Sequence, residues 1–227
     1  MSMLSTMLRY LTTHWEYVGQ LTAEHIRIVF IANGLAVVLG LALGIFISKR
    51  GREGLAEFVL YVAGILLTVP SLALYGILMA ILKALGLMSI GLVPVVVALT
   101  LYGLLPILRN TTTAVRGIDP AMIEAGRGMG MSETQILWRV KIPLAVPAIM
   151  AGLRQAVVMN VGIAAIGAYI GAGGLGQLIF RGVANTRADL VLVGALCVSL
   201  LAIGLDVAFG VVERLSTPRG LRKGARG

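Results

Sequence analysis

Long apolar stretches separated by short polar segments make up almost the whole chain. A continuous run of ~20 apolar residues is the length of helix that crosses the hydrocarbon core of a bilayer, whereas the strands of a membrane barrel would alternate in polarity over ~10 residues. The pattern therefore predicts an all-α integral membrane protein with five transmembrane helices. The expected spans are residues 28–47, 58–82, 90–108, 144–170 and 190–212.

Two of these stretches contain residues that bear on helix shape. In the first span, Ala36, Gly40 and Gly44 recur at intervals of four residues. They either form a seam for a closely packed neighbouring helix or reflect the general abundance of small residues in membrane helices. The second stretch contains Pro70 and predicts one tilted helix that is kinked there. A pair of re-entrant half-spans is the alternative, and counting two spans here would raise the total to six.

The two ends of the chain differ in composition from the spans. Aromatic residues stand among polar ones near the N-terminus, at Tyr10, Trp15 and Tyr17, which suits a segment lying at the level of the lipid headgroups. No compact apolar core with a cleavage site precedes the first span, so no removable signal peptide is expected. The chain thus divides into an N-terminal interfacial segment, a transmembrane domain with one polar loop, and a basic tail: residues 1–25, 26–212 (loop 110–143) and 213–227.

The polar loop carries its own folding signals. Asp119 can cap a helix whose first residue is a proline, because a proline at that position loses no hydrogen bond. The helix is expected over residues 120–127 and should be interrupted by Gly128 and Gly130.

A second short helix is expected after these glycines. Ser132 and Gln135 have the spacing of a capping box, so the helix should begin there and run toward Val140. Pro143 cannot extend it and disfavours helical geometry at Ile142. Two short helices joined by glycines and held between membrane spans indicate a docking surface for another protein.

Basic residues are distributed unequally between the two sides of the predicted membrane domain. Of the 19 Lys and Arg residues, thirteen fall on the side of the polar loop and the tail, five fall on the other side, and Arg154 lies within a span. Because basic residues collect in cytoplasmic loops, the N-terminus is expected outside, and the loop and the C-terminus are expected in the cytoplasm. The net charge of +9 has the same origin, so no nucleic-acid binding is expected.

No enzyme site is visible in the sequence. None of the lysines completes the G-x-x-x-x-G-K-[ST] pattern of a phosphate-binding loop. The two histidines and Cys197 lack the spacing of metal ligands, so no metal site is expected. Gly171, Gly173 and Gly176 satisfy G-x-G-x-x-G, but that pattern binds dinucleotides only between a strand and a helix, and here it follows a membrane span.

Two charged residues and two asparagines lie inside the predicted spans. Arg154 lies eleven residues after Pro143, ~16 Å along a helix, and Asp206 lies at a similar depth. Because a charge in the bilayer is usually paired or faces a cavity, these two side chains can form an intramembrane charge pair; otherwise Arg154 extends to the interface. Asn33 and Asn160 are expected to form interhelical hydrogen bonds, with a place in a solute pathway as the alternative.

The segment EAGRGMG, which begins at Glu124, is followed after nine residues by VKIP. This spacing resembles the EAA loop of ABC importer permeases, EAA-x3-G-x9-I-x-LP. The matching positions are Glu124, Ala125, Gly130 and Pro143, and the conservative departures are Gly126 for Ala, Val140 for Ile and Ile142 for Leu. The resemblance implies that these seven residues belong to coupling helices that dock into a groove on a cytoplasmic ATPase subunit.

Other blocks extend the resemblance over most of residues 26–185: TVPSLALYGIL, LYGLLPILRNT, GIDPAMIEAGRGMGM, ILWRVKIPLAVPAIMAGLR and IGAGGLGQLIFRG. They are similar to the glycine betaine/carnitine/choline permease subfamily. This implies a type I ABC importer permease fold in the bacterial inner membrane, with the coupling helices between the third and fourth spans. The implied role is the transmembrane subunit of an ATP-driven importer for quaternary ammonium osmoprotectants.

The resemblance also implies partners. ATPase subunits would bind the ATP, so this chain needs no cofactor; a second permease subunit, identical or related, would complete the pathway, and an extracytoplasmic binding protein would deliver the solute. Four glycines are expected to shape the outer mouth or gate, unless they form only a flexible loop: Gly171, Gly173, Gly174 and Gly176. GAGGLG also occurs in methionine-type permeases, so a methionine-type or other small-solute importer is an alternative. An ATP-independent channel or scaffold is another, but it would have no reason to carry the full EAA spacing.

Overall fold

The computed structural model describes residues 3–216, and all regular secondary structure in that range is helical. The elements are α1 (Met3–Thr13), α2 (Trp15–Ile47), α3 (Glu53–Thr68), α4 (Ser71–Ala84), α5 (Leu92–Arg116), α6 (Pro120–Gly128), α7 (Glu133–Ile136), the π-helical η1 (Leu137–Lys141), α8 (Ile142–Gly167), the 3₁₀ turn η2 (Ala168–Ile170), α9 (Gly176–Ala184) and α10 (Ala188–Ser216). Four helices are long and apolar enough to cross a membrane, and there are five candidates when the bent pair α3–α4 counts as one span. The predicted all-α membrane fold is confirmed.

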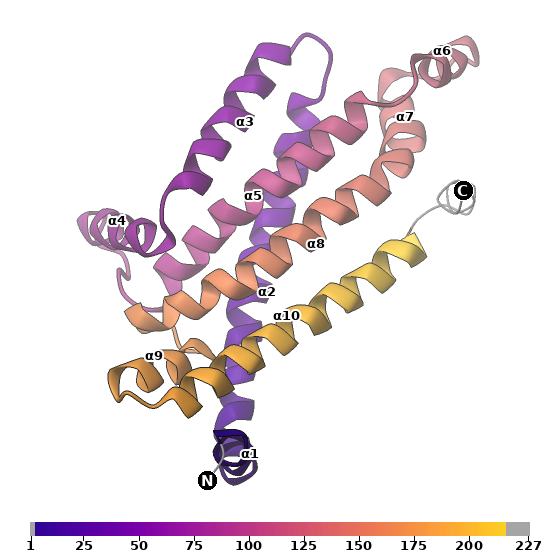
Figure 1. The fold of residues 1–227 in the computed structure, drawn as a ribbon. Coiled ribbons are helices and arrows are strands. Elements are labelled where there is room, and N and C mark those ends of the chain that lie inside the picture. The colour runs from indigo at the N-terminus through magenta and orange to yellow at the C-terminus, as the bar shows by residue number, and fades with distance from the viewer. Residues whose placement is uncertain (1–2, 217–227) are drawn as a thin grey trace.

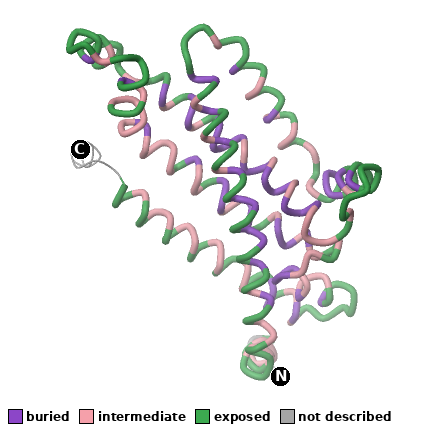
Figure 2. The backbone as a smooth tube through the Cα atoms, turned by 180° about the vertical axis from the view of Figure 1, so that it is seen from behind, coloured by how far each residue is buried: buried purple, intermediate pink, exposed green. Residues whose placement is uncertain are grey.

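Helices α2, α5 and α8 lie side by side and form the core of the bundle (Figure 1). The most apolar part of α5 is 67% buried, whereas that of α10 is 17% buried. Figure 2 shows the same gradient, with buried residues concentrated in the centre of the bundle and few of them along α10. The coupling loop with α6 and α7 lies at the end of the bundle where α10 finishes, and α1 and α9 lie at the opposite end (Figure 1).

A seam of small residues joins α2 to α5. A Cβ atom added at Gly40 would lie 2.7 Å from Cγ2 of Ile107, and one added at Gly44 would lie 2.9 Å from Cβ of Thr111. Ala36, one turn before Gly40, is fully buried. The seam is therefore a site of close helix packing, and α5 is the neighbour.

Buried amides connect α2, α5 and α8. The Asn160 amide donates to Oδ1 of Asn33 at 3.1 Å and to the Leu99 carbonyl at 2.9 Å. Gly103 provides the room, because a Cβ atom there would lie 3.1 Å from the Asn160 nitrogen. The predicted interhelical hydrogen bond is confirmed, and it fixes the three core helices in one register.

The second apolar stretch breaks where the sequence predicts, but the prediction of one kinked helix is wrong, because α3 and α4 are bent by 106°. Val69 and Pro70 are extended, with ψ of 125° and 134°. The Tyr102 hydroxyl donates to the Val69 carbonyl at 2.7 Å. The fully buried Tyr75 of α4 donates to the Ile163 carbonyl at 3.0 Å. These contacts turn α4 across α5 and α8, a larger deflection than a proline kink produces.

Several helix boundaries differ from the expected ones. Helix α5 continues beyond Arg109 because the next polar residues pack on α2, where the Thr112 hydroxyl donates to the Gly44 carbonyl at 3.4 Å. Helix α2 begins at Trp15 rather than at residue 28, and the expected loop 171–189 contains α9. Four basic residues of the tail lie outside the described residues: Arg219, Arg222, Lys223 and Arg226.

Candidate functional site

The polar loop folds as two capped helices. Oδ1 of Asp119 accepts a hydrogen bond from the Ala121 amide at 2.9 Å, which caps α6. At α7, the Ser132 amide donates to Oε1 of Gln135 at 2.8 Å, and the Gln135 amide donates to Oγ of Ser132 at 3.3 Å. Both predicted caps are confirmed, so the starts of these helices follow from residues within one turn of each other.

The change of direction between α6 and α7 depends on one glycine and not on two. Gly128 is the last residue of α6, whereas Gly130 has φ of +79°, a conformation that other residues rarely adopt. An ion pair closes the junction, with 2.7 Å between Nη2 of Arg127 and Oε1 of Glu133. The two helices therefore form one compact unit.

Gly126, where the sequence departs from the EAA pattern, is the buried residue of α6. A Cβ atom there would lie 3.3 Å from Cγ1 of Ile136 and 3.5 Å from Sδ of Met131. The Ile136 side chain of α7 thus packs directly on the α6 backbone. Alanine at position 126 would require Ile136 to move by a few tenths of an ångström.

The prediction that Pro143 ends the second helix is wrong. Helix α7 passes through the π-helical turn directly into α8, and Ile142 is helical, with φ of −61° and ψ of −49°. A proline ring clashes with the carbonyl one turn back in an α-helix, and the wider i→i+5 turn before Pro143 relieves that clash. The second coupling helix and the following span are therefore one continuous helix, Glu133–Ile170.

A cavity of about 740 Å³ lies between the coupling helices and the neighbouring ends of α2 and α5. Among the seven residues of the EAA pattern, Glu124 lines it, while Val140, Ile142 and Pro143 lie in the π turn and the start of α8. Four basic residues also line the cavity: Lys49, Arg50, Arg127 and Lys141. Basic side chains therefore outnumber acidic ones around this space, and Glu124 is the residue of the EAA pattern that lines it.

The glycine-rich loop lies at the opposite end and depends on left-handed backbone. Gly171, Gly173 and Gly174 have φ of +84°, +88° and +80°. Gly176 is required for a different reason, because a Cβ atom there would lie 1.9 Å from the carbonyl oxygen of Ala165. The loop follows a helix and not a strand, so the surroundings of a dinucleotide site are absent around it.

Two residues of α2 that the sequence does not single out contact this loop. Oε2 of Glu24 accepts a hydrogen bond from the Gly174 amide at 2.9 Å. His25 is fully buried against the same glycine. The Glu24–Gly174 contact joins residues 150 positions apart, so no motif spacing could have found it. The one available signal is a carboxylate in the N-terminal part of a largely apolar helix.

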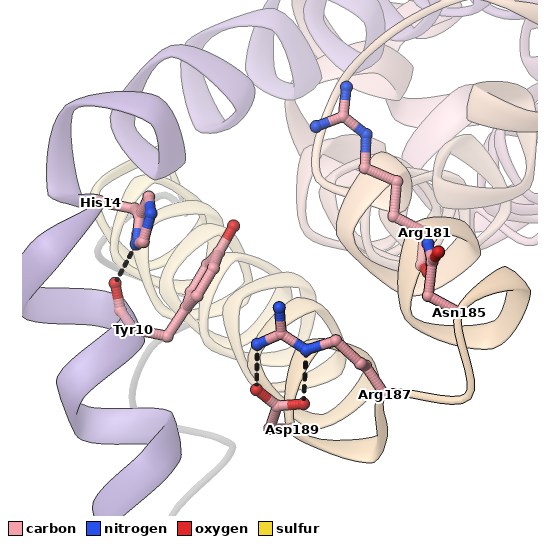
Figure 3. Close-up of polar contacts among 6 residues, drawn as sticks. All are labelled: Tyr10, His14, Arg181, Asn185, Arg187 and Asp189. Atoms are coloured by element: carbon pink, nitrogen blue, oxygen red, sulfur yellow. Dashed lines mark hydrogen bonds and ion pairs between the residues drawn. The ribbon is translucent and has the colours of Figure 1, made fainter.

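A polar cluster lies where α1 faces the connection between α9 and α10 (Figure 3). The rings of Tyr10 and His14 stack with centroids 4.4 Å apart, and burial raises the pKa of the Tyr10 hydroxyl. Arg187 forms an ion pair with Asp189 at 2.5 Å, and hydrogen bonding to this carboxylate raises the pKa of the Arg187 guanidinium. Tyr10 also packs on the apolar cluster around Leu178, which holds α1 against the bundle.

The two intramembrane charges lie in contact between α8 and α10. Nε and Nη2 of Arg154 donate to the two carboxylate oxygens of Asp206, each at 2.5 Å, and Oε2 of Glu213 lies 3.8 Å from Nη1. The guanidinium lies over Gly210, where a Cβ atom would be 3.4 Å from Nη1. The Arg154 and Asp206 side chains are 39% and 35% exposed in a groove of about 600 Å³, which Gln155 also lines. The pair therefore faces the outside of this chain and not its core.

Solved transporters share this fold. The chain superposes on a subunit of the MetNI methionine ABC transporter in an inward-facing conformation with a TM-score of 0.78 and 25% identity, covering 88% of this chain and 96% of that one. An amino acid ABC transporter with histidines gives a TM-score of 0.75 at 18% identity, covering 94% and 98%. The fold is that of type I ABC importer permeases.

Similar sequences span nearly the whole chain. The osmoprotectant import permease protein OsmW of Salmonella typhimurium is 43% identical over 95% of this chain and 99% of that protein. The glycine betaine/carnitine/choline transport system permease protein OpuCD of Bacillus subtilis is 38% identical over 99% and 95%. The carnitine transport permease protein OpuCD of Listeria monocytogenes is 39% identical over 96% and 95%. The family model for binding-protein-dependent transport system inner membrane components matches residues 36–217, and the chain therefore belongs to this family.

Proposed function

We propose that this chain is the transmembrane subunit of an importer for quaternary ammonium osmoprotectants such as glycine betaine, choline and carnitine. The observation that carries the solute class is the 38–43% identity, over nearly the full length, to permeases named for these compounds. Quaternary ammonium groups are usually held by aromatic cages, and this chain has only five Phe, six Tyr and two Trp residues. We therefore expect tight binding to reside in the soluble binding protein and this chain to provide a low-affinity passage.

In this proposal the end of the bundle with α6 and α7 faces the cytoplasm, as does the C-terminus. The thirteen basic residues on that side of the chain support this orientation. ATPase subunits dock on α6 and α7, and closure of the ATPase pair moves α7. Because α7 continues into α8 without a break, the movement reaches the membrane span directly.

A second permease subunit, identical or related, covers the exposed side of α8 and α10 in this proposal. Arg154 and Asp206 lie on that side, and a charge pair that faced lipid would be costly. We therefore assign their groove to the side of the chain that faces the pathway and the other subunit. The glycine loop, at the other end of the bundle, shapes the outer mouth.

The test is reconstitution of the importer in proteoliposomes with its ATPase subunits and binding protein. ATP inside the vesicles should drive uptake of labelled glycine betaine or choline, and uptake should stop when the ATPase subunits are left out. Uptake that proceeds equally without ATP would contradict the proposal and would favour a channel.

Substitutions in the coupling loop should separate ATP hydrolysis from uptake. A Cβ atom at Gly130 meets nothing within 4 Å, but its φ of +79° makes alanine unfavourable by roughly 1 kcal/mol, so Gly130→Ala changes the angle between α6 and α7 without disturbing packing. We expect Gly130→Ala and Glu124→Ala to accumulate as folded protein and to lower the number of solute molecules taken up per ATP hydrolysed.

Gly128→Ala is the matched control for the coupling loop. A Cβ atom at Gly128 also meets nothing within 4 Å, and its φ is ordinary, so this variant should keep the parent ratio of uptake to hydrolysis. If Gly130→Ala and Glu124→Ala also keep that ratio, the loop is not the point of coupling.

A methionine-type importer is the second candidate, supported by two MetNI structures at 25–26% identity. Competition distinguishes the two. Excess unlabelled methionine should leave uptake of labelled glycine betaine unchanged, whereas choline or carnitine should reduce it.

A further inference from the structure

The glycine-rich loop, residues 171–176, contacts two adjacent side chains of α2, Glu24 and His25. Oε2 of Glu24 accepts the Gly174 amide hydrogen at 2.9 Å. The same oxygen lies only 2.6 Å from where a Cβ atom of Gly173 would stand. Glycine at these positions therefore serves two purposes, because it permits the left-handed backbone and lets the carboxylate approach the loop.

His25 lies between the loop and α8. Its Nε2 atom carries the hydrogen and donates to the Val161 carbonyl at 3.0 Å. The other ring nitrogen, Nδ1, is buried without a hydrogen-bond partner and lies 3.0 Å from the position of a Cβ atom on Gly174. A buried acceptor without a donor is unfavourable, so this arrangement is maintained by the packing of the loop rather than by His25 itself.

Helix α2 carries these two residues and also reaches the coupling end of the bundle. It runs from Trp15 to Ile47 with no proline inside, so the segment from Glu24 to Ile47 is a rod of roughly 35 Å. At its far end, Nη2 of Arg116 donates to the Ile47 carbonyl at 2.7 Å and to the Arg52 carbonyl at 3.3 Å. The cavity next to the coupling helices is lined by residues that directly follow α2.

Helix α2 therefore contacts the loop near its N-terminal end and leads into the cavity beside α6 and α7 at its C-terminal end. We propose that α2 links the two ends of the subunit and that Glu24 is the positioning residue at its outer end: the Glu24–Gly174 hydrogen bond holds the glycine loop in its present conformation and must break when the loop moves. The His25 ring packs between the loop and α8 and sets the distance between them. This inference rests on the proposed function only for its transport readout.

Thiol accessibility tests the proposal without any transport measurement. Cys197 is the single cysteine of the chain, so Ala172→Cys in a Cys197→Ser background places one reporter thiol in the loop. The complete importer in lipid nanodiscs is treated with a polar maleimide. We expect Glu24→Ala to raise the labelling rate about tenfold, the effect expected when a hydrogen bond to a charged acceptor is lost.

Two variants control this measurement. Glu24→Gln keeps a side-chain oxygen that can accept the Gly174 hydrogen, so labelling should return close to the parent rate. Glu16→Ala removes the other carboxylate of α2, which lies two turns away and is exposed, and should have no effect. Equal labelling of Glu24→Ala and the parent, or a failure of Glu24→Gln to restore protection, would overturn the proposal.

The transport readout is the number of solute molecules taken up per ATP hydrolysed in proteoliposomes. Glu24→Ala should lower this ratio and raise hydrolysis in the absence of binding protein, and Glu24→Gln should restore both. An unchanged ratio in Glu24→Ala would refute the link to transport. If labelling changes as expected but no quaternary ammonium compound is taken up by any variant, the contact between α2 and the loop stands and the solute assignment is wrong.

Discussion

Gly176→Ala should remove most of the folded subunit from the membrane. The added Cβ atom would lie 1.9 Å from the Ala165 carbonyl oxygen, 2.7 Å from its carbon and 2.9 Å from its Cα atom. All three are backbone atoms, so no rotamer change can relieve the overlap, and α9 must separate from α8. Overpacking of this kind costs more than the ~1–3 kcal/mol of an ordinary enlarged core side chain. Size-exclusion chromatography of detergent extracts measures the folded fraction.

Gly162→Ala is the control for this substitution. Gly162 lies in α8 near Ala165, and a Cβ atom there meets nothing within 4 Å. Alanine in a helix is favoured over glycine by roughly 0.5–1 kcal/mol, so this variant should accumulate at least as well as the parent. If Gly176→Ala extracts and melts like the parent, the close approach of α9 to α8 is absent from the native protein.

Neutralising one member of the Arg154–Asp206 pair should reduce both folded protein and uptake strongly. Arg154→Gln leaves Asp206 as a carboxylate in the membrane without its bidentate partner, and Asp206→Asn leaves the guanidinium in the same position. An unpaired charge at such a site is more unfavourable than a neutral pair. The double variant should therefore recover part of the loss, so the effects of the single substitutions should not add.

The control for this cycle is a second bidentate ion pair of the same geometry. Arg187 and Asp189 form hydrogen bonds of 3.2 and 2.5 Å at the end of the bundle, beside α1 (Figure 3). This pair lies at the end of the bundle and not within a span, and its Arg187 side chain is 49% exposed. Pairs that water reaches contribute little to stability, so the corresponding single substitutions there should change yield and uptake only slightly. Losses at Arg154 and Asp206 that simply add in the double variant would rule out their coupling.

The features that could be predicted from the sequence depend on residues close together in the chain. The caps of α6 and α7 use residues two or three positions apart, and the small-residue seam repeats every helical turn. The membrane spans follow from continuous apolar runs, since each run must satisfy its own backbone hydrogen bonds in lipid. The coupling loop could also be located from the sequence, because its helix caps and its EAA spacing lie within one short polar segment.

The tertiary structure alone decided how these elements meet. The 106° turn between α3 and α4 depends on two tyrosine hydroxyls: Tyr75 of α4 donates to the Ile163 carbonyl in α8, and Tyr102 of α5 donates to the Val69 carbonyl at the break itself. The continuous helix through Pro143 depends on a π turn that no local propensity predicts. The fastening of the glycine loop joins Glu24 to a backbone amide 150 residues away. Contacts across such separations leave no periodic signal in the chain, so the sequence determined the spans, the caps and the coupling motif, and only packing determined the path of α4 and the partner of the loop.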